Sequence, residues 1–523
     1  MRKLLVYFGF IALALTTHAV AAEKVHLSIN ASKPGAKIDR NIFGQFAEHL
    51  GHGIYEGIWV GPDSTIPNTG GIRNDVVGAL RALKVPNVRW PGGCFADEYH
   101  WRKGLGPLDK RVVGLNPNWG GVTEPNDFGT HEFMDFLDQI GSEAYLSVNV
   151  GSGTPQEAAE WLEYLTTDQP TTLAKERAAN GHPAPYKVAY LGIGNESWAC
   201  GGNMTVDYYL SQLKIYSRFV RNFNPGQQVK QQMLKIAVGP GDAGTEWTDA
   251  IMKAYKTHDW SWDINGLSLH SYTVVKWPPS FASVGFGTAE YSRILKSTLE
   301  MEDLVTKQSA VMDKYDPEKK VALVVDEWGA WYAPLPGSNP GFLVQQNSLR
   351  DAVLASLNLN IFARHADRVR MANIAQMINV LEAMIVTHKE KMVLTPTYHV
   401  FRMYVPFQDA TSVPVTLDAG AYTNGDIRLP RLDAITAKDA SGKLWLAVTN
   451  LDPEKPVEIE AELAGIRVKS ATGETLTAPK VDSVNSFEAP NAVVPKSVSV
   501  KAQDGKLALT LEPKSVTVVA LEQ

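Results

Sequence analysis

Two apolar runs in this chain each lead to a glutamate, and they constrain its fold more than any other feature. The run Val188–Ile193 leads to Glu196, and the run Val321–Val325 leads to Glu327. Runs of Val, Leu and Ile with little alternation are typical of parallel strands that are buried on both faces. Barrels of parallel strands carry their sites at the carboxyl ends of the strands. Both glutamates are therefore expected at the same face of one sheet.

Further segments have the same strand-like character, and helical patterns separate several of them. Eight candidate strands can be assigned: Ile42–Phe46, Asn87–Trp90, Ala144–Val150, Val188–Ile193, Lys235–Val238, Gly266–Leu269, Ala322–Val325 and Ala372–Met377. Amphipathic stretches lie between strands at Phe133–Ile140, Ala158–Leu165 and Ser348–Phe362. Repeated strand–helix units predict an α/β fold, here a (β/α)8 TIM barrel over residues 42–394. The alternative is a doubly wound sheet, which usually has a glycine-rich phosphate loop after its first strand, and none is present there.

After residue 395 the pattern changes to short alternating segments with turns between them. These segments are Lys443–Val448, Val457–Glu460, Ser497–Val500, Leu507–Leu511 and Val516–Val519. Such alternation predicts an antiparallel, jelly-roll-like β-sandwich over residues 395–523. Val25–Ile29, within residues 22–41, alternates in the same way. We expect it to be an N-terminal strand that joins the C-terminal sandwich.

Residues 1–21 have the features of a cleaved signal peptide. Arg2 and Lys3 give a positive start, Leu4–Leu15 is apolar, and Ala19–Ala21 fits the small-x-small cleavage rule. The apolar stretch is short for a bilayer span, which favours a signal peptide over the alternative of an N-terminal membrane anchor. The sequence therefore predicts a secreted or periplasmic protein with no membrane segment after cleavage.

Charge and cysteine content exclude two classes of protein. A net charge of −6 with 20% charged residues, and no basic run, argues against a nucleic-acid partner. Cys94 and Cys200 are the two cysteines, too few for a disulfide scaffold. They can form one bridge in an oxidising compartment. Because the sequence gives no Cα separation, two free thiols are favoured.

The residues beside the two glutamates suit chemistry on a sugar. A general acid must hold its proton near the leaving oxygen, and Asn195, just before Glu196, can bond the neighbouring sugar hydroxyl. Glu327 is followed by aromatic side chains that suit the apolar faces of sugars: Trp328, Trp331 and Tyr332. Two carboxylates about 5 Å apart are the minimum equipment for double-displacement glycoside hydrolysis. Taken singly, each feature is as well explained by a salt bridge or by packing.

Polar side chains also stand at other predicted strand ends. They are Glu48 and His49, Arg89 with Gly92-Gly93-Cys94, His270 with Tyr272, and Gln376 with Asn379. Polar groups at so many strand ends are hard to explain by packing. Arg89 can keep a nucleophilic carboxylate ionised through charge pairing. His49 and His52 have a spacing that a metal could use, but no HExxH or CxxC motif is present, so no metal or other cofactor is expected.

Five motifs together resemble the α-L-arabinofuranosidases of glycoside hydrolase family 51: Phe46–Gly51, Arg89–Phe95, Gly192–Glu196, Leu269–Tyr272 and Asp326–Tyr332. The resemblance covers nearly the whole mature chain. It implies a retaining mechanism with Glu196 as acid/base and Glu327 as nucleophile. It also implies an arabinose subsite lined by Glu48, Asn195, His270, Tyr272, Trp331 and Gln376. Many bacterial members have Asn where this chain has Cys94, and a thiol is the poorer hydrogen-bond partner; Cys94 is still expected to line the sugar pocket.

These inferences predict an exo-acting enzyme. It would remove terminal non-reducing α-L-arabinofuranosyl residues from arabinoxylan, arabinan or derived oligosaccharides, so its partner is an arabinofuranosyl-containing oligo- or polysaccharide. A homo-oligomer is compatible with the sequence. One alternative is an endo-β-glucanase of the same family, which would have an open cleft instead of a pocket that the aromatic insertion Trp277–Pro279 can close. The alternative of another class, a non-catalytic carbohydrate-binding protein, is disfavoured because both glutamates are present.

Overall fold

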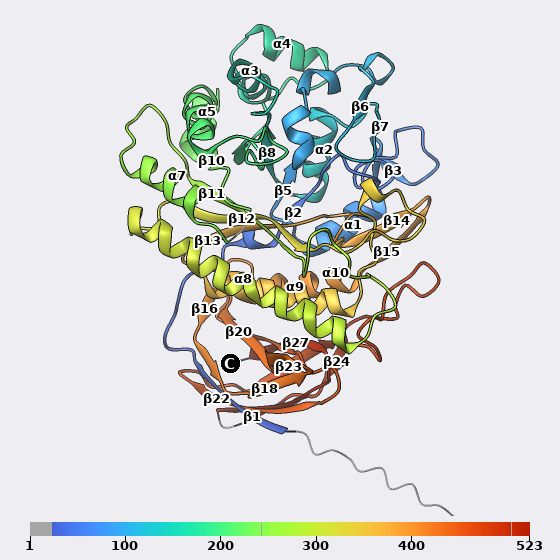
Figure 1. The fold of residues 1–523 in the computed structure, drawn as a ribbon, viewed down its shortest axis with the longest axis vertical. Helices are drawn as coiled ribbons and strands as arrows, with labels where there is room; N and C mark the ends of the chain where they lie inside the picture. Colours follow the sequence, from blue (N-terminus) through green and yellow to red (C-terminus); the bar gives the residue numbers. More distant parts are fainter. Residues whose placement is uncertain (1–22, 242, 504, 523) are drawn as a thin grey trace, which may run out of the picture.

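The computed structural model describes residues 23–241, 243–503 and 505–522. A barrel occupies the upper part of Figure 1 and a β-sandwich the lower part, with long helices between them. The predicted signal peptide, residues 1–21, lies outside the described residues. Among the helices that are described, none has the length and apolar character needed to cross a membrane.

Eight parallel strands close into a barrel, and they follow one another around it in chain order. They are β2 (Gly44–Phe46), β5 (Asn87–Trp90), β8 (Glu143–Val148), β9 (Tyr190–Ile193), β10 (Leu234–Ala237), β11 (Gly266–Thr273), β12 (Ala322–Ala330) and β13 (Val369–Ile374). The predicted (β/α)8 barrel is thereby confirmed.

Helices surround the barrel, and all of them except α4 and α6 bury apolar side chains. They are α1 (Asn74–Leu83), α2 (Thr130–Ile140), α3 (Pro155–Thr166), α4 (Thr172–Ala179), α5 (Val206–Phe219), α6 (Pro225–Lys230), α7 (Glu246–Lys256), α8 (Thr288–Tyr315), α9 (Leu349–Arg364) and α10 (Pro396–Tyr404). Capping residues in the sequence mark where several of these helices begin. The Thr154 side chain accepts a hydrogen bond from the backbone N–H of Glu157, and Pro155 fixes the first helical position of α3.

Strands β11 and β12 extend further than the sequence predicts. The apolar pattern covers Gly266–Leu269 and Ala322–Val325, but pairing continues through Thr273 and Ala330. The register shifts where Ser268 pairs with Val324 and His270 pairs with Glu327, so β12 carries one extra residue there. Such a bulge re-aims side chains locally. It explains how consecutive residues of β12 can both face the barrel interior, and why periodicity alone ended these strands early.

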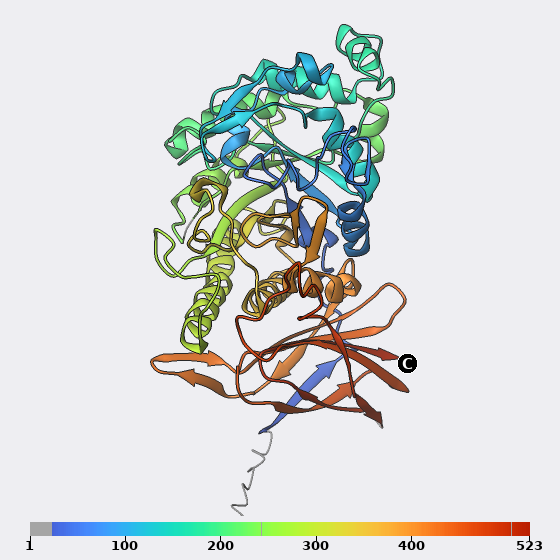
Figure 2. The same ribbon diagram turned by 90° about the vertical axis from the view of Figure 1, so that its right-hand side faces the viewer.

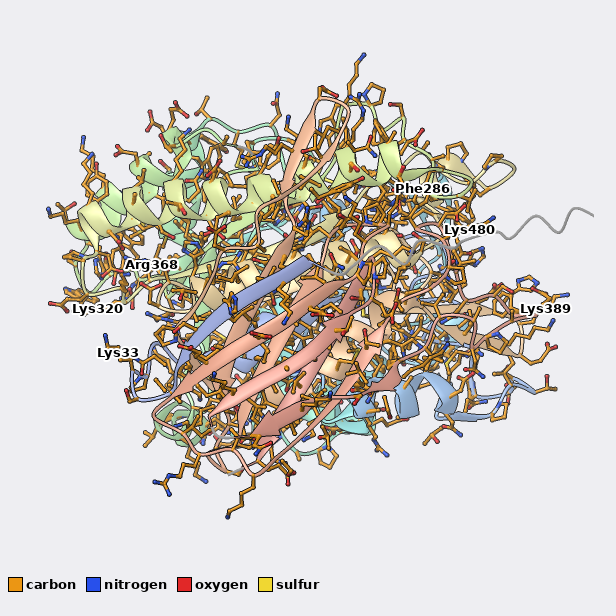
Figure 3. The ribbon with its side chains drawn as sticks, turned by 90° about the horizontal axis from the view of Figure 1, so that it is seen from below. Lys33, Phe286, Lys320, Arg368, Lys389 and Lys480 are labelled. Atoms are coloured by element: carbon orange, nitrogen blue, oxygen red, sulfur yellow. A yellow bond between two sulfur atoms is a disulfide. The ribbon has the colours of Figure 1, made fainter. Side chains whose placement is uncertain are left out.

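The C-terminal strands form two packed sheets. One has the order β17-β1-β22-β26-β25 and the other β16-β20-β21-β27-β23-β24. Their bounds are β1 (Glu23–Asn30), β16 (Thr411–Val413), β17 (Val415–Leu417), β20 (Leu432–Lys438), β21 (Leu444–Asn450), β22 (Val457–Ala464), β23 (Ser470–Leu476), β24 (Lys496–Val498), β25 (Lys501–Gln503), β26 (Lys506–Leu511) and β27 (Ser515–Glu522). Strand β1, blue in Figure 3, lies between β17 and β22. Its alternate residues Val25, Leu27 and Ile29 are buried in the core between the two sheets.

Helix α9 lies between the barrel and the sandwich, as Figure 2 shows for the layer of helices there. It contacts β12 and β13 on one side and β20, β21 and β27 on the other. The predicted amphipathic stretch is therefore buried on all sides, from Leu349 to Ala363. Its polar residues find partners in the sandwich, since Asn360 donates to Asp433 and Ser356 bonds Thr449. The division at residue 395 stays a prediction.

Candidate active site

A pocket opens at the carboxyl ends of the barrel strands. It is lined by Glu48, Leu50, Gly93, Cys94, Trp119, Asn195, Glu196, Tyr272, Glu327, Trp331, Leu343, Gln376 and Leu381. Most of the residues predicted for the site thus meet in one place. Two others, Arg89 and His270, are buried beneath it and contact the lining carboxylates.

Glu196 lies at the mouth of the pocket after a sharp change in the direction of β9. Gly194 has φ +91°, and a Cβ there would lie 3.1–3.3 Å from Ser197 and Val150. Glu196 itself has φ +37°, an uncommon conformation for a residue with a side chain. Its Oε1 lies 2.9 Å from Nδ1 of His270. The turn therefore brings Oε1 of Glu196 to His270, while the Glu196 side chain also lines the pocket.

Glu327 is buried at the bottom of the pocket with a donor on each oxygen. Arg89 donates from Nη1 to Oε1 at 2.8 Å, and the Tyr272 hydroxyl donates to Oε2 at 2.8 Å. A Cβ on Gly93 would lie 2.9 Å from Oε1 of Glu327, so only glycine fits beside this carboxylate. Two directed donors, one of them a buried cation, hold the carboxylate of Glu327 in one orientation.

The two glutamates face each other across the pocket. One carboxylate oxygen of Glu196 and one of Glu327 lie within 4.8 Å of each other, and His270 lies within the same distance of both. Carboxyl groups of retaining glycosidases lie about 5–5.5 Å apart, whereas those of inverting enzymes lie about 6.5–9.5 Å apart. The spacing of Glu196 and Glu327 is therefore closer to that of retaining enzymes than to that of inverting enzymes.

His270 is surrounded by carboxylates. Besides Glu196, its Nδ1 lies 3.5 Å from Oε2 of Glu327, and its Nε2 lies 3.3 Å from Oδ1 of Asp326. Burial alone would lower the pKa of His270, but the charges of Glu327 and Asp326 and its polar contacts with Asp326 and Glu196 outweigh burial and raise it to about 10. His270 is therefore a cation at neutral pH.

Arg89 connects three groups at the base of the site. Burial opposes its charge, but Asp326 and Glu327 raise the pKa of Arg89 above its ordinary value. Its Nη2 donates to Oδ1 of Asn195 at 2.7 Å. Since that oxygen faces the guanidinium, the Asn195 amide nitrogen is left toward the pocket, where it can donate to a sugar hydroxyl.

Glu48 forms a second polar wall. Its Oε1 accepts hydrogen bonds from the backbone N–H groups of Gly93 and Phe95 and from the indole of Trp119, and its Oε2 accepts from the amide of Gln376 at 3.0 Å. Burial, helped by the charge of Glu327, raises the pKa of Glu48 to about 7. A carboxylate with this many donors is held rigidly, as a group that recognises one hydroxyl must be.

Cys94 and Cys200 form a disulfide with a Cα separation of 5.5 Å. The expectation of two free thiols is wrong, because the loops that follow β5 and β9 meet at the rim of the barrel. Cys94 nevertheless lines the pocket. The sulfur of Cys200 lies 3.6 Å from Oε2 of Glu196, but a disulfide sulfur has no hydrogen, so this is a contact and not a hydrogen bond. The bridge thus borders the candidate acid/base.

The aromatic residues after Glu327 divide between packing and the pocket. Trp328 is fully buried against Phe362 and Phe401. Trp331 lines the pocket, with its ring centroid 5.0 Å from that of Tyr272 and 5.1 Å from that of Trp277. Trp277 is 59% exposed. The insertion therefore adds an exposed aromatic ring beside Trp331, and Trp277 is not among the residues that line the pocket.

Besides the pocket leucines Leu343 and Leu381, sequence reasoning missed three polar or aromatic residues of the site. Trp119 reaches Glu48 from a loop, Tyr145 donates to Asp326 at 2.6 Å, and Asp97 accepts from the backbone N–H of Asn195 at 3.1 Å. Burial raises the pKa of Asp97 to about 7, against hydrogen bonds from Gly151 and other backbone N–H groups. The Gly-Gly pair after Trp119 was the one available signal for a close-fitting loop.

Three polar residues singled out by the sequence have other partners. Both nitrogens of His49 are engaged, Nε2 by the Trp90 indole and Nδ1 by Glu124. His52 pairs with Glu56. Asn379 donates to His52 and Thr387. These contacts explain the three side chains without a substrate or an ion.

The closely grouped side chains of Glu196, His270 and Glu327 do not suit a metal ion. With both ring nitrogens of His270 facing carboxylate oxygens, the protonated ring has no lone pair to offer. The buried charge of Arg89 also opposes a second cation here. The site instead has the composition of an acid/base pair with permanent positive charges.

Known proteins resemble this chain over its whole length. Residues 79–264 match the family model described as Alpha-L-arabinofuranosidase 1 domain, and residues 326–515 match Alpha-L-arabinofuranosidase C-terminal domain. A Bacteroides ovatus protein named "Intracellular exo-alpha-L-arabinofuranosidase" is 44% identical over 523 residues, covering 99% of both chains. The crystal structure of the GH51 arabinofuranosidase from Xanthomonas axonopodis pv. citri is 50% identical, with a TM-score of 0.92 over 95% of this chain and 100% of that one. The Thermotoga maritima α-L-arabinofuranosidase arabinose complex is 30% identical, with a TM-score of 0.83 over 95% and 100%.

The same comparison corrects the predicted location. The Bacteroides ovatus relative aligns over nearly its full length and is named as intracellular. The prediction of a signal peptide and of a secreted or periplasmic protein is therefore contradicted. A charged start followed by an apolar stretch is a signal of composition alone, and composition does not determine where a protein is located.

Proposed function

Because this chain belongs to the α-L-arabinofuranosidases of glycoside hydrolase family 51, we propose that it cleaves terminal arabinofuranosyl groups by double displacement between Glu327 and Glu196. The proposed mechanism and substrates start from the α-L-arabinofuranosidase activity of this family. The substrates that we propose are arabinoxylan, arabinan and their oligosaccharides, cleaved at non-reducing ends. The observation that supports the mechanism is the pair of carboxylate oxygens within 4.8 Å of each other across one pocket.

In the first step, Glu327 attacks the anomeric carbon. The donors from Arg89 and Tyr272 hold its carboxylate in place for the attack. The bond from the anomeric carbon to the leaving oxygen breaks as the bond to Glu327 forms. Glu196 gives its proton to the leaving oxygen. Since Oε1 of Glu196 faces the N–H of His270, the proton is carried on Oε2.

In the second step, water attacks the same carbon from the face that the leaving group has vacated. Glu196 takes the proton of that water, and the bond to Glu327 breaks to restore the carboxylate. Two inversions give net retention. The arabinose is recognised by Glu48 with Gln376, by the Asn195 amide and by the ring of Trp331, which supplies an apolar surface for the sugar.

An exo mode of action is supported by the residues that border the pocket. Leu50, Leu343 and Leu381 come from loops on one side, and the Cys94–Cys200 bridge borders another. An endo-β-glucanase would need an open cleft on both sides of the scissile bond. The non-catalytic alternative is set aside, because the relatives are enzymes.

The test compares two substrates and one product. We expect rapid release of 4-nitrophenol from 4-nitrophenyl α-L-arabinofuranoside and no reducing sugar from carboxymethylcellulose. With methanol as acceptor, the methyl arabinofuranoside should have the α configuration by NMR. Formation of the β glycoside would overturn the retaining mechanism, and cleavage of carboxymethylcellulose alone would overturn the proposed substrate.

A further inference from the structure

The structure surrounds His270 with acceptors on both ring nitrogens. Nδ1 faces Glu196 at 2.9 Å and Glu327 at 3.5 Å, while Nε2 faces Asp326 at 3.3 Å. A neutral imidazole has one N–H and would leave one nitrogen lone pair against a carboxylate oxygen. An imidazolium has an N–H on each nitrogen. The arrangement of acceptors therefore fits the cation.

Asp326 is fixed in its place by groups from other strands. Its Oδ2 accepts a 2.6 Å hydrogen bond from Tyr145 of β8 and lies 3.5 Å from Nε of Arg89 in β5. Its Oδ1 is left to face His270. Burial raises the pKa of Asp326, but the charges of Arg89 and His270 outweigh burial and lower it. Asp326 is thus a buried, ionised neighbour of the histidine.

The three carboxylates around His270 differ in what the reaction does to them. In the proposed mechanism, on which this step rests, Glu327 becomes a neutral ester and Glu196 alternately gives and takes a proton. Asp326 is the one of the three that keeps its charge throughout. The bulge in β12 makes this possible, because it lets Asp326 and Glu327 face the interior from consecutive positions.

We propose that Asp326 is a positioning residue that keeps His270 cationic in the arabinosyl-enzyme, so that the Nδ1–H of His270 continues to hold Glu196 for the second step. Without this counter-ion, loss of the Glu327 charge on ester formation would leave Glu196, which has by then given up its proton, as the remaining carboxylate beside His270, near a second buried cation, Arg89. His270 would then lose its proton and release Oε1 of Glu196. The Glu196 carboxylate would no longer be aimed at the attacking water.

The charged and titratable groups around His270 come from several strands. Glu196 follows β9, Asp326 and Glu327 belong to β12, and Arg89 lies in β5 beyond them. Tyr272 lies on the same strand as His270 and bonds Glu327. A pH effect can be assigned to Asp326 only if the other charged groups stay in place. The isosteric substitution Asp326→Asn leaves them in place.

The first test uses Asp326→Asn with Tyr145→Phe as its matched control. Tyr145→Phe removes a hydrogen bond to the same carboxylate but leaves its charge. We expect the ring nitrogens of His270, followed by 15N NMR and assigned with His270→Gln, to titrate at least one pH unit lower in Asp326→Asn. The alkaline limb of kcat should move down with it, and kcat at pH 8 should fall about 100-fold or more. In Tyr145→Phe, the titration of His270 and the alkaline limb of kcat should each stay within about half a pH unit of the wild type.

A merely structural role would lower kcat equally at every pH and leave the His270 titration in place, and that result overturns the proposal. A second measurement does not change Asp326. In Glu196→Ala, the arabinosyl-enzyme should accumulate with Glu327 esterified and Glu196 removed. We expect His270 to remain an imidazolium at pH 8 in that species; a neutral ring there contradicts the inference.

The two proposals can fail separately. If mass spectrometry finds no covalent arabinosyl adduct in Glu196→Ala, double displacement fails, while the resting-state titration of Asp326→Asn still reports on His270. If the adduct forms but the His270 titration does not respond to Asp326→Asn, the mechanism stands and the role of Asp326 falls.

Discussion

Arg89 donates a 2.8 Å hydrogen bond from Nη1 to Oε1 of Glu327, although the two residues are 238 positions apart in the sequence. The contact crosses the barrel interior from β5 to β12. Both side chains are almost inaccessible to solvent. A buried ion pair of this kind is weak evidence for stability, but it fixes where a negative charge can stand. The catalytic assignments proposed above depend on that fixed charge.

Arg89→Met should therefore damage both stability and activity. It leaves Asp326 and Glu327 without their shared cation, which typically destabilises a protein by about 3–5 kcal/mol. We expect kcat/KM to fall about 1000-fold or more, and the urea midpoint to drop. Arg89→Lys is the control, since it keeps the charge but cannot reach Glu327 and Asn195 together. Equal losses in the two variants would contradict a role for the charge.

The pH dependence of stability should reveal His270. Its folded pKa of about 10 lies above its ordinary value of 6.5, so its contribution is fully present below pH 6.5 and is lost as pH rises to 10. We expect the difference in unfolding free energy between wild type and His270→Gln to shrink over that range, by on the order of a few kcal/mol. Denaturant titrations at pH 6.5, 8.5 and 10 measure it. A difference that is constant with pH would show that His270 is not a folded-state cation.

Glu48→Gln should weaken sugar recognition. The two oxygens of Glu48 already accept from N–H donors of Gly93, Phe95, Trp119 and Gln376, so an amide NH2 group would face donors. Leaving a buried polar group without its hydrogen bond typically costs about 1–3 kcal/mol. If the sugar complex bears this cost, kcat/KM should fall about 10- to 100-fold. Asn379→Asp is the control, because Asn379 bonds His52 and Thr387 instead. Comparable losses of kcat/KM in both variants would show that any disturbance of this end of the barrel lowers activity, and would contradict a specific role of Glu48 in sugar recognition.

The fold was largely readable from the sequence because its signals are local. Buried strands are apolar runs, and Asn195-Glu196 and Asp326-Glu327 follow them directly. The ends of β11 and β12 were missed because a bulge, unlike a period, has no residue signature there. The sequence predicts an amphipathic helix at α9, but α9 is buried on all sides because sandwich strands from far along the chain cover its outer face.

The wall residues of the site were less predictable than its carboxylates. Trp119 and Asp97 act through loop geometry, and Tyr145 lies inside an apolar strand, where a tyrosine reads as core. The disulfide depends on how close two loop ends approach, which spacing in sequence does not determine. The catalytic carboxylates could be predicted from the sequence, whereas the donors that bond each of their oxygens become known only from the fold.

Loss of the Cys94–Cys200 bridge should destabilise the barrel rim. The bridge closes a loop with a sequence separation of 106, for which chain entropy gives about 5 kcal/mol. We expect the double variant Cys94→Ser/Cys200→Ser to melt at a lower temperature and to lose activity, because both loops border Glu196. A phosphine reductant should lower the melting temperature of the wild type and leave the double variant unaffected. An unchanged melting temperature in the double variant would refute a stabilising role.

The assignment of Glu196 and Glu327 is tested most directly by azide with the two alanine variants on 4-nitrophenyl α-L-arabinofuranoside. In Glu196→Ala the first step retains a good leaving group that needs little protonation, and azide needs no general base. The account predicts that azide restores turnover and that NMR identifies the α-L-arabinofuranosyl azide, with retained configuration. In Glu327→Ala no arabinosyl-enzyme can form, so any azide product should be the β anomer. If Glu327→Ala instead gives the retained α azide and Glu196→Ala the inverted one, the two roles are exchanged and the account is wrong.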